Sequence, residues 1–372
     1  MKVQIVRRWA VVAAGLAVLC ALPVIASALP VSVPPLTASQ LRGRILASAD
    51  ESFAGYAESN ATFGLPPLAG LTSLTSLLDG ATKMRVWQAT PTRWRVDVLS
   101  DAGERDTYEL SGCRTYIWDS GDELLTEVRG RQAFRLPRPA DLVPPALALR
   151  LLSEGGRQAR FSVIAPVRVA GQSAAGLRMT SADPASTVGR VDIWADPSSG
   201  LPLMVEIFGR DSARPALKSQ FFQVSPWQPD PRVLTPVRAS GTGFTVTSAD
   251  KLAGALRNLG LVGLPAQLAG RDRQPVPSGY GAIGVYGGGL ATFVAVAVRG
   301  SAGLHLVPDA LSAGGAALDV SGDAGALISA PLINAVIVRP TGFFITFLLA
   351  GTVSAQVLEQ AATMLTEQVT LP

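Results

Sequence analysis

Short runs rich in valine, tryptophan, tyrosine and threonine alternate with turn residues through residues 81–130 of the chain. The turn signals recur about every ten residues, and each run ends at proline, glycine or aspartate. β-Branched and aromatic side chains suit a half-buried pleated surface, so this pattern predicts an antiparallel meander of four or five strands. From Arg93 to Val98 the odd positions are charged and the even ones apolar, which predicts a strand with one wet face and one dry face.

The segment before the meander predicts one amphipathic helix and one strand. The helix is expected over residues 37–51, with Thr37 or Ser39 as its cap. Its apolar positions recur at helical spacing and are Leu41, Ile45, Leu46 and Ala49. Residues 53–63 alternate loosely and predict a first strand. Residues 66–80 are apolar and rich in glycine, serine and threonine, so they fit either a short helix or a mobile flap.

A proline-rich stretch at residues 226–236 is the predicted domain boundary. Beyond it, Asp250 is placed to cap a helix. Residues 279–300 predict a strand pair that turns at the glycines 287–289, which precede a strand pattern and lack the Gly-Lys-Ser/Thr ending of a phosphate-binding loop. Residues 326–365 predict two more strands and a closing helix capped by Ser354. One face of that helix carries Val357, Leu358, Ala361 and Leu365.

The first residues have the order of a secretory leader. Three basic residues precede an apolar run from Trp9 to Ile25, and small residues at 26–28 fit signal-peptidase cleavage. The apolar run has roughly 17 to 20 residues, on the border between a long signal sequence and a membrane span. Residues 1–28 are therefore predicted to be either a signal peptide or an N-terminal membrane anchor. In both cases the rest of the chain is expected outside the cytoplasm, in the periplasm or cell envelope.

Composition places the chain among globular proteins. Of its 372 residues, 48% are hydrophobic and 16% charged, which is ample for buried cores in two domains. The formal net charge is +4, but removing the three basic residues of the leader from the total of 32 leaves 29 basic against 28 acidic residues. Because no stripe of lysine and arginine remains to neutralise phosphates, we expect no nucleic-acid partner.

Residues that could carry catalysis are few, and we expect no enzymatic activity. His305 is the only histidine, and it lies in a strand-like apolar run without a nucleophile motif such as Gly-x-Ser-x-Gly, so a structural role is expected. Leu19 precedes Cys20 where a lipidation signal requires a small residue, which leaves Cys20 as part of the leader. Cys113 is then the only exported cysteine, expected to be a small buried residue at a strand edge. One histidine and one cysteine cannot form a zinc site, and no calcium-loop motif occurs, so neither metal nor cofactor is expected.

Several segments resemble the LolA/RseB-like superfamily of lipoprotein carriers and MucB/RseB sigma-E regulatory proteins, over roughly residues 37–225. Residues 85–112 and 114–128 resemble the core hairpins of this superfamily, and residues 136–147 its proline-rich start of a midchain helix. Residues 169–183 and 189–208 resemble its Trp-x-Asp-x-x-x-Gly-x-Pro pair of strands, and residues 217–224 its closing strand. In this pair Asp196 and Gly200 are predicted to form the turn and Pro202 to start the returning strand. The residues that follow resemble the two-domain regulator branch, of the actinobacterial type.

The resemblance implies a mainly β, α+β fold. Its first domain, residues 37–225, would be a strongly curved antiparallel sheet that forms an unclosed half-barrel with plugging helices. A linker at 226–236 and a smaller C-terminal α+β domain at 237–372 would follow. The half-barrel of this superfamily encloses an apolar cavity that binds acyl chains, and wide aromatic side chains on successive strands suit such a lining, although each also suits plain core packing. The candidate lipid-cavity residues are Trp87, Trp94, Tyr108, Trp118, Phe134, Trp194, Phe208 and Phe221.

Three functions fit this resemblance. The first is an exported, non-enzymatic RseB-like regulator that holds an acyl chain of a lipid or lipoprotein and contacts a membrane-anchored partner such as an anti-sigma factor. The second is a LolA-like carrier of lipoproteins or lipids in the cell envelope. The third is a structural envelope module with a filled core. The residues after the half-barrel favour the first, because a shuttle requires only a cavity whereas a regulator requires a second contact surface.

Overall fold

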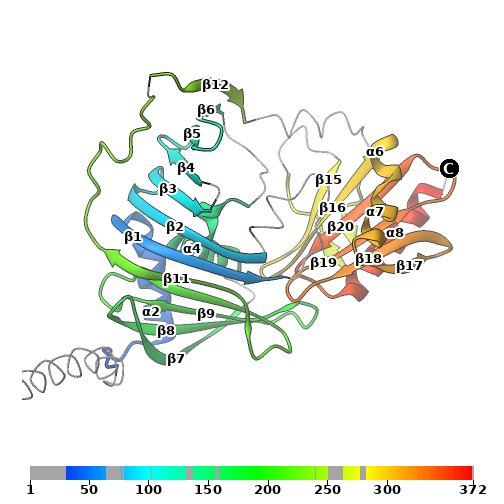
Figure 1. Cartoon of the computed structure of the whole chain (residues 1–372). Helices are drawn as coiled ribbons and strands as arrows, with labels where there is room; N and C mark the ends of the chain where they lie inside the picture. Colours follow the sequence, from blue (N-terminus) through cyan, green and yellow to red (C-terminus); the bar gives the residue numbers. More distant parts are fainter. Residues whose placement is uncertain are drawn as a thin grey trace, which may run out of the picture.

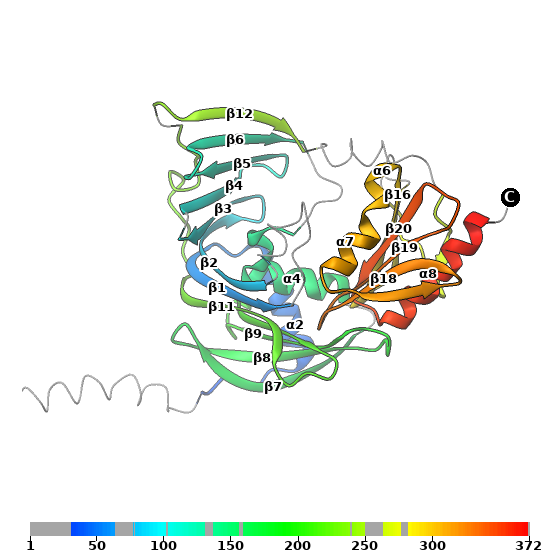
Figure 2. The ribbon, with the colours of Figure 1, turned by 45° about the vertical axis from the view of Figure 1, so that its right-hand side comes forward.

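Two sheets of unequal size contain most of the strands, and their pairings are antiparallel except for that of β12 with β6. The computed structural model describes residues 31–63, 77, 79–101, 103–130, 137–155, 159–238, 240–249, 263–276 and 282–370. The large sheet has twelve strands in the order β12-β6-β5-β4-β3-β2-β1-β11-β10-β9-β8-β7. It is strongly curved, and its two edge strands, β12 and β7, lie far apart (Figures 1 and 2). The predicted unclosed half-barrel with a smaller second sheet is therefore confirmed.

Two meanders share the large sheet. Strand β1 pairs with β2 on one side and with β11 on the other, so the β1–β11 seam joins β2–β6 to β7–β11. Residues 81–130, where four or five strands were predicted, contain five, β2–β6, the first of which begins at Asp79. The strands are β1 (Phe53–Thr62), β2 (Asp79–Thr90), β3 (Arg93–Ser100), β4 (Gly103–Glu109), β5 (Arg114–Asp119), β6 (Leu124–Arg129), β7 (Ala159–Val169), β8 (Gln172–Ser181), β9 (Val188–Ala195), β10 (Pro202–Gly209), β11 (Pro215–Ser225) and β12 (Gly243–Ser248).

Helix α2 (Ala38–Ala47) begins as the sequence predicts. The Thr37 side chain accepts a hydrogen bond from the Gln40 N–H, and the Gln40 side chain accepts one from the Thr37 N–H, which completes a capping box. Leu41 and Ile45 are fully buried, whereas Leu46 is 38% exposed, so the buried stripe is narrower than the sequence suggested. A short 3-10 turn, η1 (Ser48–Asp50), ends the helix and leads into β1.

Helix α4 (Pro144–Gly155) follows the proline-rich stretch that was expected to start a helix. The 3-10 turn η2 (Pro139–Leu142) precedes it. Leu147, Ala148 and Leu152 of α4 are buried in one hydrophobic core with Leu41 and Ile45 of α2. This core lies on the concave side of the large sheet, where Figure 2 shows both helices against the region around β1, β11 and β9.

Strand β12 joins the large sheet from beyond the proline-rich stretch. It pairs in parallel with β6, and Phe244 lies opposite Leu125. The strand lies within the range 237–372 that was predicted to form the C-terminal domain, so one edge of the large sheet comes from that range. The domain limits at residues 225 and 237 remain a prediction.

The small sheet has six strands in the order β15-β16-β20-β19-β18-β17. The predicted strand pair with a glycine turn is confirmed as β15 and β16, but residues 326–365 contain all or part of three strands where two were expected. Helix α8 covers one face of the sheet, with Leu358, Ala361 and Leu365 buried as predicted, and α7 packs on the other. The elements are β15 (Ile283–Gly288), β16 (Ala291–Arg299), α6 (Ser301–Leu304), α7 (Leu306–Ser312), β17 (Ala316–Val320), β18 (Asp323–Ser329), β19 (Asn334–Arg339), β20 (Ile345–Gly351) and α8 (Ala355–Thr370), with a two-residue hairpin of β13 (Gln267–Leu268) and β14 (Arg271–Asp272) beside β15.

Hydrogen bonds join the two sheets at the turn between β8 and β9. The Thr187 N–H donates to the Thr352 carbonyl at 3.1 Å, and the Ser354 N–H donates to the Ala185 carbonyl at 2.8 Å. The hydroxyl of Ser186 donates to the Leu290 carbonyl at 2.7 Å. Two of these three hydrogen bonds join main-chain groups directly, so the junction satisfies backbone groups of both sheets.

Three sequence predictions fall outside the described residues: the leader at 1–28, the helix expected after Asp250, and most of the excursion at 66–80. Among the described helices, none is both long enough and apolar enough to cross a bilayer.

Candidate functional site

The register of the large sheet assigns each side chain to one of two faces. Residues directly opposite each other on paired strands share a face, and neighbours along a strand alternate. Met84, Val86 and Val96 are buried in the core that contains α2 and α4, so they mark the concave, inner face. The opposite, convex side is the outer face.

The inner face divides into a covered half and an open half. Helices α2 and α4 contact β7, β8, β10 and β11. Seven uncharged inward side chains of β3, β5 and β6 remain partly exposed: they are Trp94, Val98, Thr115, Ile117, Leu124, Thr126 and Val128. We call these seven residues the inner wall. It is a surface of apolar and threonine side chains on the concave side, interrupted by the inward charges of Arg105 and Glu109 on β4 and of Asp119 on β5.

Only two of the eight predicted lipid-cavity residues lie on the inner face. Trp94 belongs to the inner wall, and the Arg138 guanidinium lies 4.8 Å from its ring centroid. Phe221 is 1% exposed and packs edge-on against Phe53 at 5.7 Å, so it is part of the sealed core. Phe134 lies outside the described residues.

The remaining five aromatic residues lie on the outer face: Trp87, Tyr108, Trp118, Trp194 and Phe208. Trp194 is buried beneath the bulge of β7, where its Nε1–H donates to the Ala165 carbonyl at 3.0 Å. The Arg190 guanidinium lies 3.6 Å from the ring centroid of Phe208. The structure thus brings Trp87, Tyr108 and Trp118 together, but on the side opposite to the inner wall.

A buried charge cluster lies among these outer aromatics. Arg95 donates to Asp97 at 2.5 Å and to Asp106 at 2.9 Å, and the Tyr108 hydroxyl donates to Asp106 at 3.3 Å. The same guanidinium lies over the rings of Trp87 and Tyr108, at 5.1 and 4.8 Å from their centroids. Asp97 is only 1% exposed and Asp106 only 5%.

The predicted wet face of β3 is therefore wrong at its centre. Val96 is buried, which confirms the predicted apolar face of β3. The opposite, charged face is covered by a segment that follows β11. Arg95 donates a hydrogen bond to the Val233 carbonyl of this segment at 3.3 Å, which holds the segment against the sheet. The alternation of charged and apolar residues assigned the side chains to the correct faces of β3. It could not show that a segment more than a hundred residues away covers the charged face.

Burial shifts the acid–base behaviour of the cluster. It raises the pKa of Asp97 to about 7, although the hydrogen bond and charge of Arg95 act in the opposite direction. Burial also raises the pKa of Asp106 and that of Tyr108. For Arg95 burial alone would lower the pKa, but the hydrogen bond to Asp97 and the nearby carboxylates keep it above its ordinary value.

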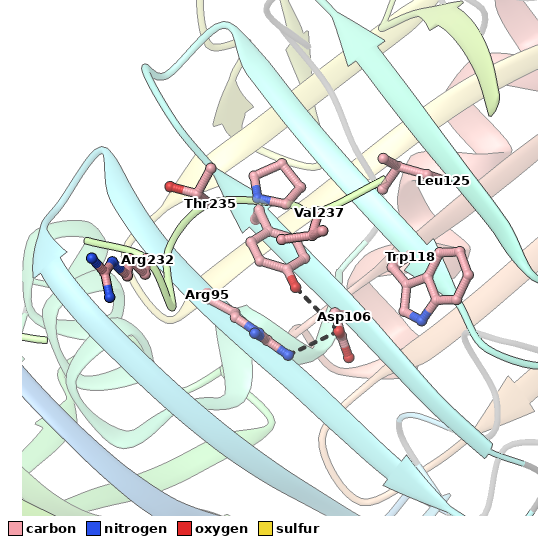
Figure 3. Close-up of a pocket in the computed structure, with 9 residues that line it drawn as sticks. Arg95, Asp106, Trp118, Leu125, Arg232, Thr235 and Val237 are labelled. Atoms are coloured by element: carbon pink, nitrogen blue, oxygen red, sulfur yellow. Dashed lines mark hydrogen bonds and ion pairs between the residues drawn. The ribbon is translucent and has the colours of Figure 1, made fainter. Parts of the chain in front are cut away.

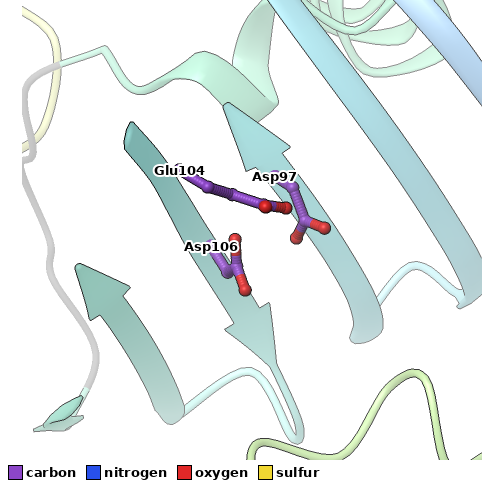
Figure 4. A group of neighbouring side chains, drawn as sticks. All are labelled: Asp97, Glu104 and Asp106. Atoms are coloured by element: carbon purple, nitrogen blue, oxygen red, sulfur yellow. The ribbon is translucent and has the colours of Figure 1, made fainter. Parts of the chain in front are cut away.

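Asp97, Glu104 and Asp106 each place a carboxylate oxygen within 4.8 Å of the others (Figure 4). Their oxygen atoms are ligands of the kind that hard divalent cations take. Arg95 already supplies one positive charge to the group, and burial raises the pKa of Asp97, which favours its neutral form and so less repulsion among the carboxylates. The sequence gave no sign of this group, because its members come from two strands and belong to no metal motif.

A cavity of about 230 Å³ lies next to the cluster on the outer face (Figure 3). It is lined by Arg95, Asp106, Tyr108, Trp118, Leu125, Arg232, Thr235, Pro236 and Val237. Ligand pockets for drug-sized molecules have about 300 to 1,000 Å³, so this cavity suits a few water molecules or a small polar group better than an acyl chain.

Two further predictions are corrected by the structure. Cys113 is exposed in the turn between β4 and β5, where its carbonyl accepts from the Gly130 N–H, so it is not a buried residue. His305 lies exposed at the helical junction of α6 and α7 and not in a strand. The apolar run around it has helical as well as strand character, which short apolar runs do not distinguish.

No family model and no curated protein sequence matches the chain. Among solved structures, the fold is similar to that of the MucA/MucB complex of Pseudomonas aeruginosa, with 17% identity, a TM-score of 0.49, and coverage of 87% of this chain and 96% of that chain. A LolA superfamily protein from Nitrosomonas europaea matches 54% of this chain and 99% of its own, at 13% identity and a TM-score of 0.25. A putative outer membrane lipoprotein-sorting domain from Vibrio parahaemolyticus matches 50% and 89%, at 10% identity and a TM-score of 0.21. The similarity concerns the fold alone.

Proposed function

We propose that this chain is an exported, RseB-like binding protein that holds an acyl chain of a lipid or lipoprotein against the inner wall and contacts a membrane-anchored partner such as an anti-sigma factor. The inner wall is the observation that carries the proposal. Val98, Ile117 and Val128 keep apolar surface partly exposed on a concave side, and such surface gains free energy when an apolar guest covers it. The leader-like N-terminus supports export.

A second exposed apolar feature supports a partner contact. Phe343 and Phe344 lie between β19 and β20 of the small sheet, and they are 39% and 76% exposed. Aromatic side chains are enriched at the centres of protein interfaces, because each buries a large area at low entropic cost. The two apolar features lie on different sheets, so one can hold a lipid while the other contacts a protein.

The lipid part is tested by native mass spectrometry of the purified chain and by titration with a fluorescent palmitate analogue. Ile117→Gln places an amide on the inner wall and should weaken binding at least tenfold, because the amide loses its water partners beneath the acyl chain. Tyr116→Gln is the matched control, since Tyr116 is the preceding residue and points to the outer face. Equal binding by both variants and the wild type would remove the inner wall from the proposal.

The partner part is tested by chemical cross-linking in membrane preparations. Phe344→Ser should abolish cross-links to a membrane protein, whereas Phe222→Ser, which alters a similarly exposed aromatic on β11, should keep them. Lipid binding without any membrane-protein partner would favour the LolA-like carrier, because a carrier requires only the inner wall.

A further inference from the structure

Two aspartates lie directly opposite each other in the buried charge cluster of the outer face. Asp97 of β3 pairs with Asp106 of β4, and only 1% and 5% of these residues are exposed. Like charges in such a cross-strand pair are destabilising, and burial removes the water that would solvate them. Glu104 lies diagonal to Asp97 in the same ladder and adds a third carboxylate. A group of this kind requires positive charge close by.

Arg95 serves half of the oxygen atoms of the two aspartates. Its guanidinium donates to Oδ1 of Asp97 at 2.5 Å and to Oδ2 of Asp106 at 2.9 Å. The other two oxygen atoms, Oδ2 of Asp97 and Oδ1 of Asp106, are buried and have no hydrogen-bond partner. Buried polar atoms of native proteins are nearly always paired with protein, water or an ion. Two unpaired carboxylate oxygens at this depth therefore indicate a site for a positively charged or hydrogen-bond-donating ligand.

The geometry and the charge of the group favour a divalent cation. Figure 4 shows the three carboxylates converging between β3 and β4, and one oxygen atom of each lies within 4.8 Å of the others. When all three are ionised, the single guanidinium of Arg95 leaves a formal charge of −2 in the group. Arg85 lies opposite Asp97 on β2, but it is exposed, so solvent and salt screen its charge. One divalent cation would neutralise the group.

Calcium suits this arrangement better than magnesium. Ca²⁺ takes about six to eight oxygen ligands at about 2.3 to 2.6 Å in flexible geometry, so ligands on opposite sides of the ion lie up to about 5 Å apart. Mg²⁺ demands a near-ideal octahedron at about 2.0 to 2.1 Å, which carboxylates fixed on two strands are less able to provide. The cavity of about 230 Å³ that Asp106 lines has room for the water molecules that complete a calcium shell.

We propose that Asp97, Glu104 and Asp106 bind one Ca²⁺ ion on the outer face of the large sheet, with water in the adjacent cavity completing its coordination. This inference does not rest on the proposed lipid binding. The three ligands come from two neighbouring strands and belong to no calcium-loop motif, which is why the sequence indicated no metal. A proton shared by the two aspartates is the alternative explanation of their unpaired oxygens, and only the cation makes the protein respond to calcium.

The test is titration of the purified, chelator-treated full chain with CaCl₂. Isothermal titration calorimetry should give a Kd of about 0.1 to 1 mM, the range of extracellular calcium modules. Calcium at about 10 mM should raise the Tm by at least about 2 °C, because the ion binds the folded state. Tb³⁺, which takes the same oxygen ligands, should luminesce when Trp118 is excited, since Trp118 lies opposite Asp106. Excess Ca²⁺ should remove this emission.

Two ligand variants and one control locate the ion. Asp97→Asn and Glu104→Gln each remove one charged ligand and should weaken calcium binding at least about tenfold, because affinity depends on the number of such ligands. Glu127→Gln is the matched control. Glu127 is also a buried carboxylate of the outer face, but Arg129 donates to both of its oxygen atoms, at 2.8 and 3.0 Å. This variant should leave the Kd unchanged.

Four results would overturn the proposal: no calcium binding by the wild type at about 10 mM, well above the expected Kd, tighter binding of Mg²⁺ than of Ca²⁺, unchanged calcium affinity of Glu104→Gln, or equal loss with Glu127→Gln. Circular dichroism of each variant shows that it is folded. Glu104 is only half-buried, so its variant decides the question even if Asp97→Asn fails to fold.

Discussion

Asp183, in the turn after β8, forms an ion pair with Arg271 of β14 at 2.8 Å, and this pair links the large sheet to the hairpin beside the small one. Arg271 also donates to the Ala291 carbonyl at 3.1 Å, so one guanidinium contacts both sides of the junction. Both side chains are mostly buried, with 24% of Asp183 and 15% of Arg271 exposed. Here solvent screens the pair less than it screens a surface salt bridge.

We expect Asp183→Asn and Arg271→Gln to be coupled. A double-mutant cycle on the free energy of unfolding should give an interaction energy of about 1 kcal/mol, because the pair is partly but not fully shielded. Urea denaturation of the four proteins measures it. Strict additivity of the two substitutions would show that the ion pair does not stabilise the junction.

The same carboxylate gives a pH dependence at acid pH. Burial alone would raise the pKa of Asp183, but hydrogen bonds from Arg271 and the Ala185 N–H lower it below its ordinary value. Its contribution to stability is therefore present above the ordinary carboxyl pKa of about 4 and is lost as the pH falls through the lower pKa of the folded state. Asp183→Asn should reduce this loss in denaturation curves recorded at about pH 2 to 5.

Asp97 should contribute a pH dependence of stability opposite to that of Asp183. Its pKa is raised to about 7 in the folded protein, so the folded state binds a proton more tightly than the unfolded chain does. The stabilisation is fully present below the unfolded pKa of about 4 and is lost as the pH rises through about 7. Asp97→Asn should flatten the decrease in stability between about pH 4 and pH 7. An unchanged slope for this variant would assign the decrease to other groups, and direct titration of Asp97 by NMR checks the assignment.

Phe221 and Phe222 provide a matched pair on β11. Phe221 is 1% exposed, so Phe221→Ala should lower the free energy of unfolding by about 3 to 5 kcal/mol through lost burial and a new cavity. Phe222 is 47% exposed, so Phe222→Ala should change the free energy of unfolding by about 0.5 kcal/mol or less. Similar effects of the two changes in urea denaturation would contradict the assigned register of β11.

Gly200 should tolerate no side chain. Its φ is +78°, and a Cβ there would collide with the main-chain carbonyl of Arg44 in α2. Gly200→Ala should therefore destabilise the protein by about 1 to 3 kcal/mol. Gly43→Ala, in the neighbouring helix, is the contrasting variant, since a Cβ there meets no atom within 4 Å and alanine favours the helix by about 1 kcal/mol. In thermal denaturation, the Tm should fall for Gly200→Ala and rise for Gly43→Ala.

Local patterns predicted much of this fold. The helix cap is Thr37, one of the two caps that the sequence offered, and the turn from Asp196 to Gly200 and the start of β10 at Pro202 are where the sequence placed them. Each depends on the chemistry of a few neighbouring residues. Strand alternation also separated the two faces of β3 correctly.

Long-range coverage could not be predicted in this way. The segment around Val233 determines whether Asp97 is exposed to solvent. The register between β4 and β5 determines which face of the sheet Trp118 occupies. An aromatic side chain suits a core, a lipid cavity or an outer pocket equally well, so residue type alone placed Trp87, Tyr108 and Trp118 in one group without fixing their side of the sheet.

The β1–β11 seam has a consequence for how the chain reaches this structure. Ala61 lies opposite Leu217, and Ala54 lies opposite Ser225, so this pairing forms only after the intervening polypeptide has been brought into a loop. Each meander can form from local hairpins, but the seam that unites them is among the most non-local contacts in the molecule. We therefore expect slow folding in which two half-sheets with temporarily unpaired margins exist before they join, and such margins are the points at which newly made chains are most open to misassociation.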